Sequence, residues 1–357
     1  MKLDLDPSTA RGLSATRYLR AMTVARGDPI AAQAYAESQN WSDRNRVVQA
    51  IRAAVDPLDS TGADAMLGPV ATDLVELVSA ASIVGKLPAL RRVPMNARST
   101  AVTTGATAAW RGEGTPITVS KLALASITTL TPLSVASVVV VTRELVRFSD
   151  PSVDAVLRRD LQRALASALD SAFIDASNAG ESAVKPASVT NGVSAVPSTG
   201  ASVAQIGADL QAAIEALLDA GGDLTSAAWV VNPRTASFIA GLRGSGGSPV
   251  HPEATCIGGR PLGLPLIASS AVPIAATTGE PTTITLIDSS GVVFAENGAH
   301  LEVAQHASLQ LDDAPTSDPS EQVSLWQQGL AAWRATLHVN WVAARAGCVA
   351  VISGVTF

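Results

Sequence analysis

Ser182 and Lys185 are the residues of this chain whose spacing could support covalent catalysis, because Ser-x-x-Lys places a serine nucleophile beside a lysine base. The motifs Ser-Asp-Asn and Lys-Thr-Gly, which accompany that pair in serine acyl-enzymes, do not occur. The pair also lies in a connector rich in Ser, Ala, Val, Gly and Pro, residues 181–200, which the composition predicts to be flexible. GxSxG, P-loop and HExxH motifs are absent as well, so we predict no catalytic residue and no enzymatic activity.

Residue types that bind metals give no site either. The histidines are scattered along the chain: His251, His300, His306 and His338. Two isolated cysteines lack metal-ligand spacing, namely Cys256 and Cys348. Three aspartates of an acidic turn lack the glycine and the spacing of a calcium loop: Asp312, Asp313 and Asp318. We therefore expect no metal and no cofactor, and we expect both cysteines to be buried, reduced thiols.

The composition indicates a surface poor in charge. Of the 357 residues, 47% are apolar and 16% are charged, which supplies apolar material for one large domain or two ordinary ones. Low charge is typical of subunits that cover much of their surface with other subunits. An alanine-rich genome bias is the alternative explanation. The net charge is −6 and no basic block occurs, so sequence-specific binding to nucleic acid is not indicated.

No segment of the sequence indicates a membrane protein. The chain has no run of 18 apolar residues, and its first residues lack the apolar stretch of a signal peptide. We therefore expect a protein that is soluble and cytoplasmic when made.

The first third of the chain changes from helical to extended patterns. Apolar spacing predicts helices over residues 9–26, 29–38, 42–55 and 67–82. After Gly85 and Pro88 the pattern becomes β-like, and residues 98–110 and 117–130 are predicted to pair as a hairpin around Gly112-Glu-Gly114. Its side chains are small and polar, so this hairpin would be marginal unless it packs on another subunit.

A long amphipathic helix is the clearest local prediction. It follows a β-branched run, residues 135–142, and is expected to span residues 151–178. Asp150 can cap its first N–H groups, and Pro151 suits the first helical position. Its apolar face recurs every four residues, at Leu157, Leu161, Leu165, Leu169 and Phe173.

The remainder of the chain alternates helices and strands. Ser202-Val-Ala-Gln205 is a capping box that opens a helix, and Asn232 is expected to cap a second helix after a short buried strand at 229–231. Strands are predicted at 283–288, 292–295 and 348–352. Between them, five apolar residues recur at helix or strand spacing: Trp326, Leu330, Trp333, Leu337 and Trp341.

Five local features in this order resemble those of the major capsid proteins of tailed phages, which share the Hong-Kong-97-type fold. They are Trp110…Glu113…Ile117-Thr-Val-Ser-Lys121, Val139-Val-Val-Thr-Arg143-Glu144-Leu145, Leu169-Asp170-Ser-Ala-Phe173, Trp229-Val-Val-Asn232-Pro233-Arg234 with Gly263-Leu-Pro265-Leu, and Trp333-Arg334-Ala with Val349-Ala-Val-Ile-Ser-Gly354. Each feature alone is weak, and their order is the stronger signal. The resemblance covers roughly residues 65–357.

The resemblance implies an α+β fold with an N-terminal arm, an extended E-loop hairpin, a peripheral (P) domain with a long spine helix, and an α/β axial (A) domain. The implied boundaries are a helical arm at 1–66, P-domain segments at 67–97, 132–186 and 301–357, the E-loop at 98–131, and the A-domain at 187–300, with the spine helix at 151–178. We expect the arm to extend along neighbouring subunits. The alternative is a helical cap on its own domain.

The resemblance also implies a function without chemistry. The chain would be a major capsid protein that assembles with itself as pentamers and hexamers into the icosahedral shell of a tailed phage, a virion component made and assembled in the host cytoplasm. The shell would enclose double-stranded DNA without sequence-specific binding. Scaffolding, portal and decoration proteins would be its partners. An encapsulin-like compartment around a cargo protein is the alternative.

Six E-loop residues are the expected inter-subunit contacts: Trp110, Arg111, Glu113, Ile117, Val119 and Leu122. Trp110 is an aromatic anchor in an otherwise polar hairpin, although it could instead pack within its own subunit. Some members of the family join subunits by a Lys–Asn isopeptide bond. The hairpin tip here has no lysine, and the stretch around Leu325 and Ala332 has neither Asn nor Glu, so we predict no covalent crosslink.

Overall fold

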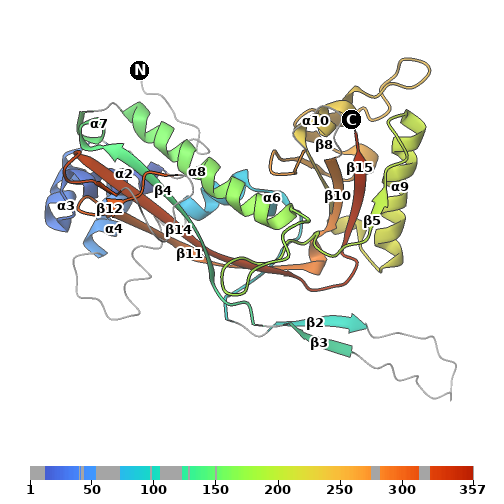
Figure 1. The fold of residues 1–357 in the computed structure, drawn as a ribbon, viewed down its shortest axis with the longest axis horizontal. Helices are drawn as coiled ribbons and strands as arrows, with labels where there is room; N and C mark the ends of the chain where they lie inside the picture. Colours follow the sequence, from blue (N-terminus) through green and yellow to red (C-terminus); the bar gives the residue numbers. More distant parts are fainter. Residues whose placement is uncertain are drawn as a thin grey trace. The chain divides into compact units, whose positions relative to one another are not determined.

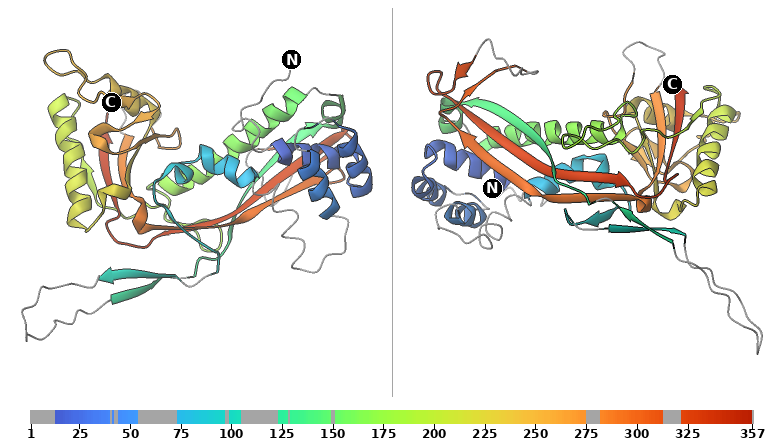
Figure 2. Two further views of the ribbon diagram at one scale, coloured as in Figure 1. Left: turned by 180° about the vertical axis from the view of Figure 1, so that it is seen from behind. Right: turned by 60° about the horizontal axis from the view of Figure 1, so that its bottom comes forward.

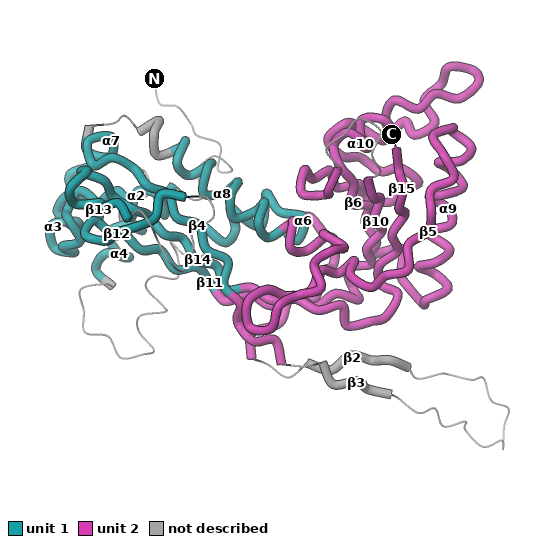
Figure 3. Tube along the Cα trace, in the orientation of Figure 1, with its two compact units in different colours: residues 1–85, 134–169, 298–338 teal, residues 86–133, 170–297, 339–357 magenta. Residues whose placement is uncertain are grey.

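The computed structural model describes residues 13–39, 41, 44–53, 73–96, 99–104, 123–127, 129–148, 151–274, 282–312 and 322–356. The chain divides into two compact units, which Figure 3 distinguishes by colour. Unit 1 comprises residues 1–85, 134–169 and 298–338, and unit 2 comprises residues 86–133, 170–297 and 339–357. Helices and sheets are mixed in the fold, as the sequence predicted.

Unit 1 contains the N-terminal helices α2 (Leu13–Val24), α3 (Pro29–Ser38) and α4 (Arg44–Ala53), and residues 73–81 form a further helix before α6 (Ile83–Lys86). The strand β4 (Leu133–Thr142) leads through α7 (Arg143–Phe148) to the long helix α8 (Pro151–Ile174).

A four-stranded sheet has the order β1-β11-β14-β4, with β1 at Arg91–Val93, β11 at Val292–Ala304 and β14 at Leu330–Ala343. Helix α8 runs beside β4, β11 and β14 (Figures 1 and 2).

Helix α8 begins at the predicted residue but ends four residues earlier than predicted, at Ile174. The carbonyl of Phe173 accepts a hydrogen bond from the N–H of Val189 at 3.0 Å, and the carbonyl of Ile174 accepts one from the hydroxyl of Thr190 at 2.8 Å. These tertiary partners satisfy carbonyls at the C-terminus of the helix. The returning segment therefore fixes where the helix stops.

The described N-terminal helices, between residues 13 and 53, have contacts within their own chain. All but two residues of α2 are buried, including polar ones. The indole Nε1 of Trp333 in β14 donates to the hydroxyl of Thr23 in α2 at 2.8 Å, and Nε2 of Gln305 donates to the carbonyl of Thr23 at 2.7 Å. Helices α3 and α4 pack on α2. The alternative, a helical cap on its own domain, matches these contacts.

Unit 2 is built around a seven-stranded mixed sheet with the order β5-β15-β10-β6-β9-β8-β7. Its strands are β5 (Ala195–Pro197), β6 (Ala227–Val231), β7 (Ala254–Thr255), β8 (Gly258–Gly259), β9 (Leu266–Ala268), β10 (Thr282–Asp288) and β15 (Val349–Val355). Helix α9 (Val203–Asp219) packs against β5, β10 and β15, and α10 (Pro233–Gly241) packs against β7 and β9. The described part of this unit also contains short 3-10 helices, η1 (Leu224–Ser226), η2 (Pro261–Gly263) and η3 (Ser289–Gly291).

Both predicted helix caps of unit 2 are confirmed. The hydroxyl of Ser202 accepts from the N–H of Gln205 and the capping box is complete. Asn232 accepts from the N–H of Arg234 at 3.0 Å and begins α10 directly after β6, whose residues are all buried. Between these helices the core of the unit gathers apolar side chains such as Leu210, Trp229 and Ile352.

The last predicted apolar stripe is a strand, and Trp326 does not belong to it. The strand β14 begins at Leu330, and Trp333, Leu337 and Trp341 are buried along it. Trp326 precedes the strand in a tight turn and is 61% exposed. The turn breaks the spacing that the sequence suggested.

Candidate functional site

Ser182 and Lys185 lie together on an exposed turn of unit 2. The N–H of Glu181 donates to the carbonyl of Lys185 at 2.8 Å, and the N–H of Lys185 donates back to the carbonyl of Glu181 at 3.0 Å. Both Ser182 and Lys185 are exposed. The spacing of Ser182 and Lys185 is therefore part of a solvent-exposed, hydrogen-bonded turn.

The histidines and cysteines are arranged differently from the sequence expectation. His300 of β11 and His338 of β14 form an edge-to-face pair with ring centroids 5.3 Å apart. Their sequence separation gives no signal of this pair, because only the strand order of the sheet brings them together.

Across the described ranges, no group of three or more His, Cys, Asp or Glu could hold a metal ion. Cys348 is buried as expected, whereas Cys256 is exposed on the turn between β7 and β8, so that expectation is wrong.

All six expected contact residues, Trp110, Arg111, Glu113, Ile117, Val119 and Leu122, lie outside the described residues. The strands that flank them are described. Strand β2 (Ser99–Thr104) pairs antiparallel with β3 (Ala123–Ile127), from Ser99 opposite Ile127 to Thr104 opposite Ala123. The predicted pairing of the two arms is therefore present in these strands, which lie side by side in Figure 1, with Thr104 opposite Ala123.

The exposed Trp326 lies in a hydrogen-bonded turn, and sequence reasoning did not single it out as a contact residue. The N–H of Leu330 donates to the carbonyl of Leu325 at 2.8 Å, and Gly329 has a φ of +65°, which favours glycine. The N–H of Arg143 donates to the carbonyl of Gly329 at 2.9 Å, so the first turn of α7 fastens this loop. A large aromatic ring exposed on a fixed support is typical of an interface anchor.

Unit 2 exposes its own apolar side chains. Ile257 is 89% exposed at the turn between β7 and β8, next to Cys256. Phe238 on α10 and Leu262 on η2 are also exposed. None of the described helices is long and apolar enough to span a membrane. Single exposed apolar residues are ordinary on a protein surface, so Ile257 stands out by its degree of exposure at a hairpin tip.

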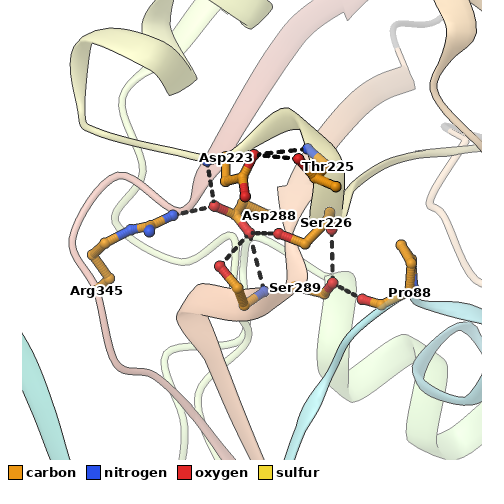
Figure 4. Close-up of polar contacts among 8 residues, drawn as sticks. Pro88, Asp223, Thr225, Ser226, Asp288, Ser289 and Arg345 are labelled. Carbon is orange, nitrogen blue, oxygen red and sulfur yellow. Dashed lines mark hydrogen bonds and ion pairs between the residues drawn. The ribbon is translucent and has the colours of Figure 1, made fainter.

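A buried carboxylate organises one end of the seven-stranded sheet (Figure 4). Asp288, at the end of β10, is 0% exposed. One of its carboxylate oxygens accepts from the hydroxyl of Ser226 at 2.6 Å and from the N–H and hydroxyl of Ser290, at 3.0 and 2.7 Å. The other accepts from the N–H of Asp223 at 2.8 Å and forms an ion pair with Arg345. The cluster thus ties together loops on both sides of β10.

The environment of Asp288 keeps it ionised. Burial by itself raises the pKa of this carboxyl group, but the hydrogen bonds from Asp223, Ser226 and Ser290 and the contact with Arg345 outweigh burial and lower the pKa to about 2. Burial raises the pKa of the neighbouring Cys348 thiol, which favours its protonated form. The cluster joins the loops at 223–226 and 288–290 to Arg345.

Comparison with known proteins gives matches of one kind. The model of the phage capsid family matches residues 62–340. A capsid polyprotein of Pseudomonas phage PAJU2 is 34% identical over an alignment of 323 residues, and the match covers 87% of this chain and 48% of that protein. The chain therefore spans about half the length of this curated relative.

Solved structures share the fold. A chain from Gordonia phage Cozz superimposes with a TM-score of 0.54 at 17% identity, covering 78% of this chain and 85% of that one. A chain from Mycobacterium phage Ogopogo gives a TM-score of 0.54 at 20% identity, covering 76% of this chain and 91% of that one. The capsid of an empty GTA particle, computed with C5 symmetry, gives 0.50 at 18% identity and covers 74% of this chain and 87% of that one.

Proposed function

Because the chain belongs to the phage capsid family, we propose that it is the major capsid protein of a tailed phage and assembles with itself into an icosahedral head shell. As a phage capsid protein it is part of the virion. The predicted Hong-Kong-97-type fold is confirmed by the shared fold of the phage structures. The single observation that carries the proposal is that the family match covers most of the chain, residues 62–340.

The proposed subunit has an E-loop at 98–131, an A-domain at 187–300 and P-domain segments at 67–97, 132–186 and 301–357. Pairing of β2 with β3 supports an E-loop hairpin, and the sheet of unit 2 supports an α/β A-domain. The proposed shell contacts come from the E-loop, from the N-terminal arm and from A-domain rings, while α2, α3 and α4 also pack on one another within unit 1.

Pentamers and hexamers of this chain would enclose double-stranded DNA without sequence-specific contacts, in the host cytoplasm. A net charge of −6 supports a wall that does not bind the genome tightly. Scaffolding, portal and decoration proteins remain proposed partners. The named phage relatives do not favour the encapsulin alternative.

Replacing Trp326 by alanine is expected to impair assembly without destabilising the subunit. Burying an exposed indole at a subunit contact contributes about 2 kcal/mol or more, which corresponds to roughly a thirtyfold rise in the threshold concentration for assembly. The isolated subunit should change by less than about 0.5 kcal/mol, because the ring is exposed. Light scattering gives the threshold and urea unfolding gives the stability. An unchanged threshold would remove Trp326 from the interface.

Particles of this chain should contain no isopeptide crosslink. Asn340 is the one asparagine between residues 301 and 357, and both ends of its amide are engaged. Its Nδ2 donates to the carbonyl of Thr131 at 2.7 Å, and its Oδ1 accepts from the N–H of Trp341 at 2.8 Å. Boiled in SDS, purified particles should therefore give a single band at the monomer mass. A ladder of multimers would contradict this prediction.

Negative-stain electron microscopy of the purified chain, beside size-exclusion chromatography, tests the proposed function. Closed polyhedral particles, or pentamers and hexamers, are expected, either from the chain alone or with its scaffolding protein. A monomer that stays monomeric at high concentration and with scaffolding protein added would overturn the proposal.

A further inference from the structure

The turn between β7 and β8 presents an apolar side chain at the tip of a hairpin. This tip is Cys256–Ile257, and it lies between Thr255 and Gly258, which are paired across the hairpin. The hydroxyl of Thr255 donates to the carbonyl of Gly258 at 2.8 Å, and β8 continues into the seven-stranded sheet by pairing with β9. Ile257 is nevertheless 89% exposed. The fold therefore holds an isoleucine out from the end of a sheet.

The part of the sheet that carries the tip is basic. Between residues 224 and 279 the chain has three arginines and one carboxylate: Arg234, Arg243, Arg260 and Glu253. Arg243 is engaged at the end of α10, where its Nη1 donates to two backbone carbonyls at 3.1 and 3.2 Å. Arg260 is exposed and follows β8 directly, three residues after Ile257. Among the described residues, neither Arg260 nor Glu253 is part of an ion pair.

The last part of α9 has the opposite charge, and we call residues 215–219 the α9 end. Glu215 and Asp219 are exposed and one helical turn apart, with Leu218, which is 46% exposed, beside them. Two like charges at this spacing are unfavourable, and so are carboxylates at the C-terminus of a helix. Glu215 accepts a hydrogen bond from Nε2 of Gln211 at 3.3 Å, which brings no positive charge.

The chain supplies no nearby cation in sequence to offset these acids. No lysine, arginine or histidine occurs between Lys185 and Arg234. Within the part of the chain that the structure describes, neither Glu215 nor Asp219 forms an ion pair. A partner that brings a positive charge and an apolar side chain would therefore complement the α9 end.

The tip and the α9 end lie on opposite sides of the same sheet. The strand order runs from β5 to β7, and Figure 1 shows α9 beyond β5 and β15, with β8 and α10 on the other side. Two different patches at opposite sides of a subunit make a head-to-tail contact, which generates a ring when the rotation closes. Contact between two tips would instead bring two Arg260 side chains together.

We propose that the tip of one copy docks on the α9 end of a second copy, with Ile257 against Leu218 and Arg260 facing Glu215 and Asp219. The partner is the chain itself, because its two sides complement each other in charge and each presents an apolar side chain. This inference rests on the proposed shell function, and it assigns residues to the contact within A-domain rings.

The exposed thiol of Cys256 allows the contact to be tested by crosslinking. The original chain is mixed with a chain that carries Cys256→Ser and Leu218→Cys, and a bismaleimide is added. The matched control carries Cys256→Ser and Val203→Cys, since Val203 is also exposed on α9 but lies about 22 Å away along the helix. Crosslinked peptides are measured by mass spectrometry.

The Leu218→Cys chain should give at least tenfold more crosslink to Cys256 than the Val203→Cys chain. Equal yields, or no crosslink to either chain, would overturn the proposal. Crosslinks between two Cys256 residues in place of the expected product would show that the tips meet one another, and would overturn it as well.

Charge reversal tests the polar part of the contact. Arg260→Glu in the chain that supplies Cys256 should lower the crosslink yield at least tenfold, because it places a carboxylate opposite two others. Adding Glu215→Lys and Asp219→Lys to the Leu218→Cys chain should restore the yield to within twofold. Arg163→Glu, which reverses an exposed arginine of α8, should leave the yield within twofold. If the two lysines do not restore the yield, Arg260 does not face the α9 end and the proposal is wrong.

A second measurement uses the original chain without substitution. Cys256 should react with a maleimide at least tenfold more slowly in assembled particles than in dissociated subunits, and the buried Cys348 is the internal reference for unfolding. Equal rates would mean that the tip stays uncovered in the shell. If the original chain forms no particles, with or without scaffolding protein, the shell function fails, and the crosslink still decides the contact. Particles without the crosslink would leave the shell function standing and overturn this contact alone.

Discussion

Replacing Asp288 by asparagine is expected to destabilise the subunit by about 3–5 kcal/mol, because it leaves Arg345 opposite a neutral group in a buried cluster. Asparagine keeps the shape of the side chain but turns one acceptor into a donor. In either orientation its amide nitrogen faces a backbone N–H, that of Asp223 or that of Ser290, so a donor loses its partner. Urea unfolding of the dissociated subunit, followed by circular dichroism, measures the change.

The matched control for Asp288→Asn is Glu302→Gln, which breaks the exposed ion pair between Glu302 and Arg334. Both of those side chains are more than half exposed, so the loss should stay below about 1 kcal/mol. Adding Arg345→Met to Asp288→Asn should cost less than the sum of the two single changes, because the unpaired charge is removed. Equal effects of Asp288→Asn and Glu302→Gln would show that the cluster does not stabilise the fold.

Asp288 also predicts how stability depends on pH. Its pKa is about 2 in the folded chain and 3.8 is its ordinary value, so the folded state favours the ionised form. The stabilisation is therefore fully present above about pH 4 and is lost as the pH falls from about 4 to about 2, by roughly 2 kcal/mol. The asparagine variant should lack this part of the acid sensitivity.

Replacing Trp333 by alanine should lower the free energy of unfolding by about 3–5 kcal/mol and detach the N-terminal helices from the rest of unit 1. The ring is fully buried, and its Nε1 hydrogen bond to Thr23 joins β14 to α2. Limited proteolysis should then cut within residues 13–53, where the original chain is expected to resist because α2 is buried. Trp333→Phe keeps most of the ring volume and loses the hydrogen bond, so about 1–2 kcal/mol is expected.

Trp326→Ala is the natural control for Trp333→Ala, since it removes the same side chain from an exposed turn seven residues earlier. It should leave the proteolytic pattern unchanged. Resistance of residues 13–53 to protease in the Trp333→Ala chain would mean that α2 is held mainly by other contacts.

Local signals in the sequence predicted individual elements well. Ser202 with Gln205 and Asn232 with Pro233 each specify a helix start through hydrogen bonds within a few residues, and both starts are present. The end of α8 could not be predicted in the same way, because Val189 and Thr190 determine it from outside the helix. Periodicity likewise placed Trp326 and Trp333 in one stripe, whereas a turn separates an exposed ring from a buried one.

Features made by distant residues gave no local signal. The cluster around Asp288 joins loops from 223–226, 288–290 and 345, and a cavity in unit 1 is lined by residues in or directly after α2, α7 and β11. Each requires the strand order and the packing of helices on sheets, which no spacing rule specifies. The N-terminal segment is a further case: helical spacing was evident, but only the contact with Trp333 and Gln305 shows what the helices pack against.

The position of the last strands in their sheets bears on how the protein is synthesised. Strand β15 lies between β5 and β10, and β14 lies between β11 and β4, so both sheets have late-made strands in their interior. The four-stranded sheet cannot close until residues up to about 343 have left the ribosome, and the seven-stranded sheet cannot close until residues up to about 355 have left it. Helix α2 completes its packing only when Trp333 is available. Chains that terminate early would thus expose unpaired strand edges and be left to chaperones and proteases. Only chains translated through β15 could complete both sheets, and only such complete subunits could then join a particle.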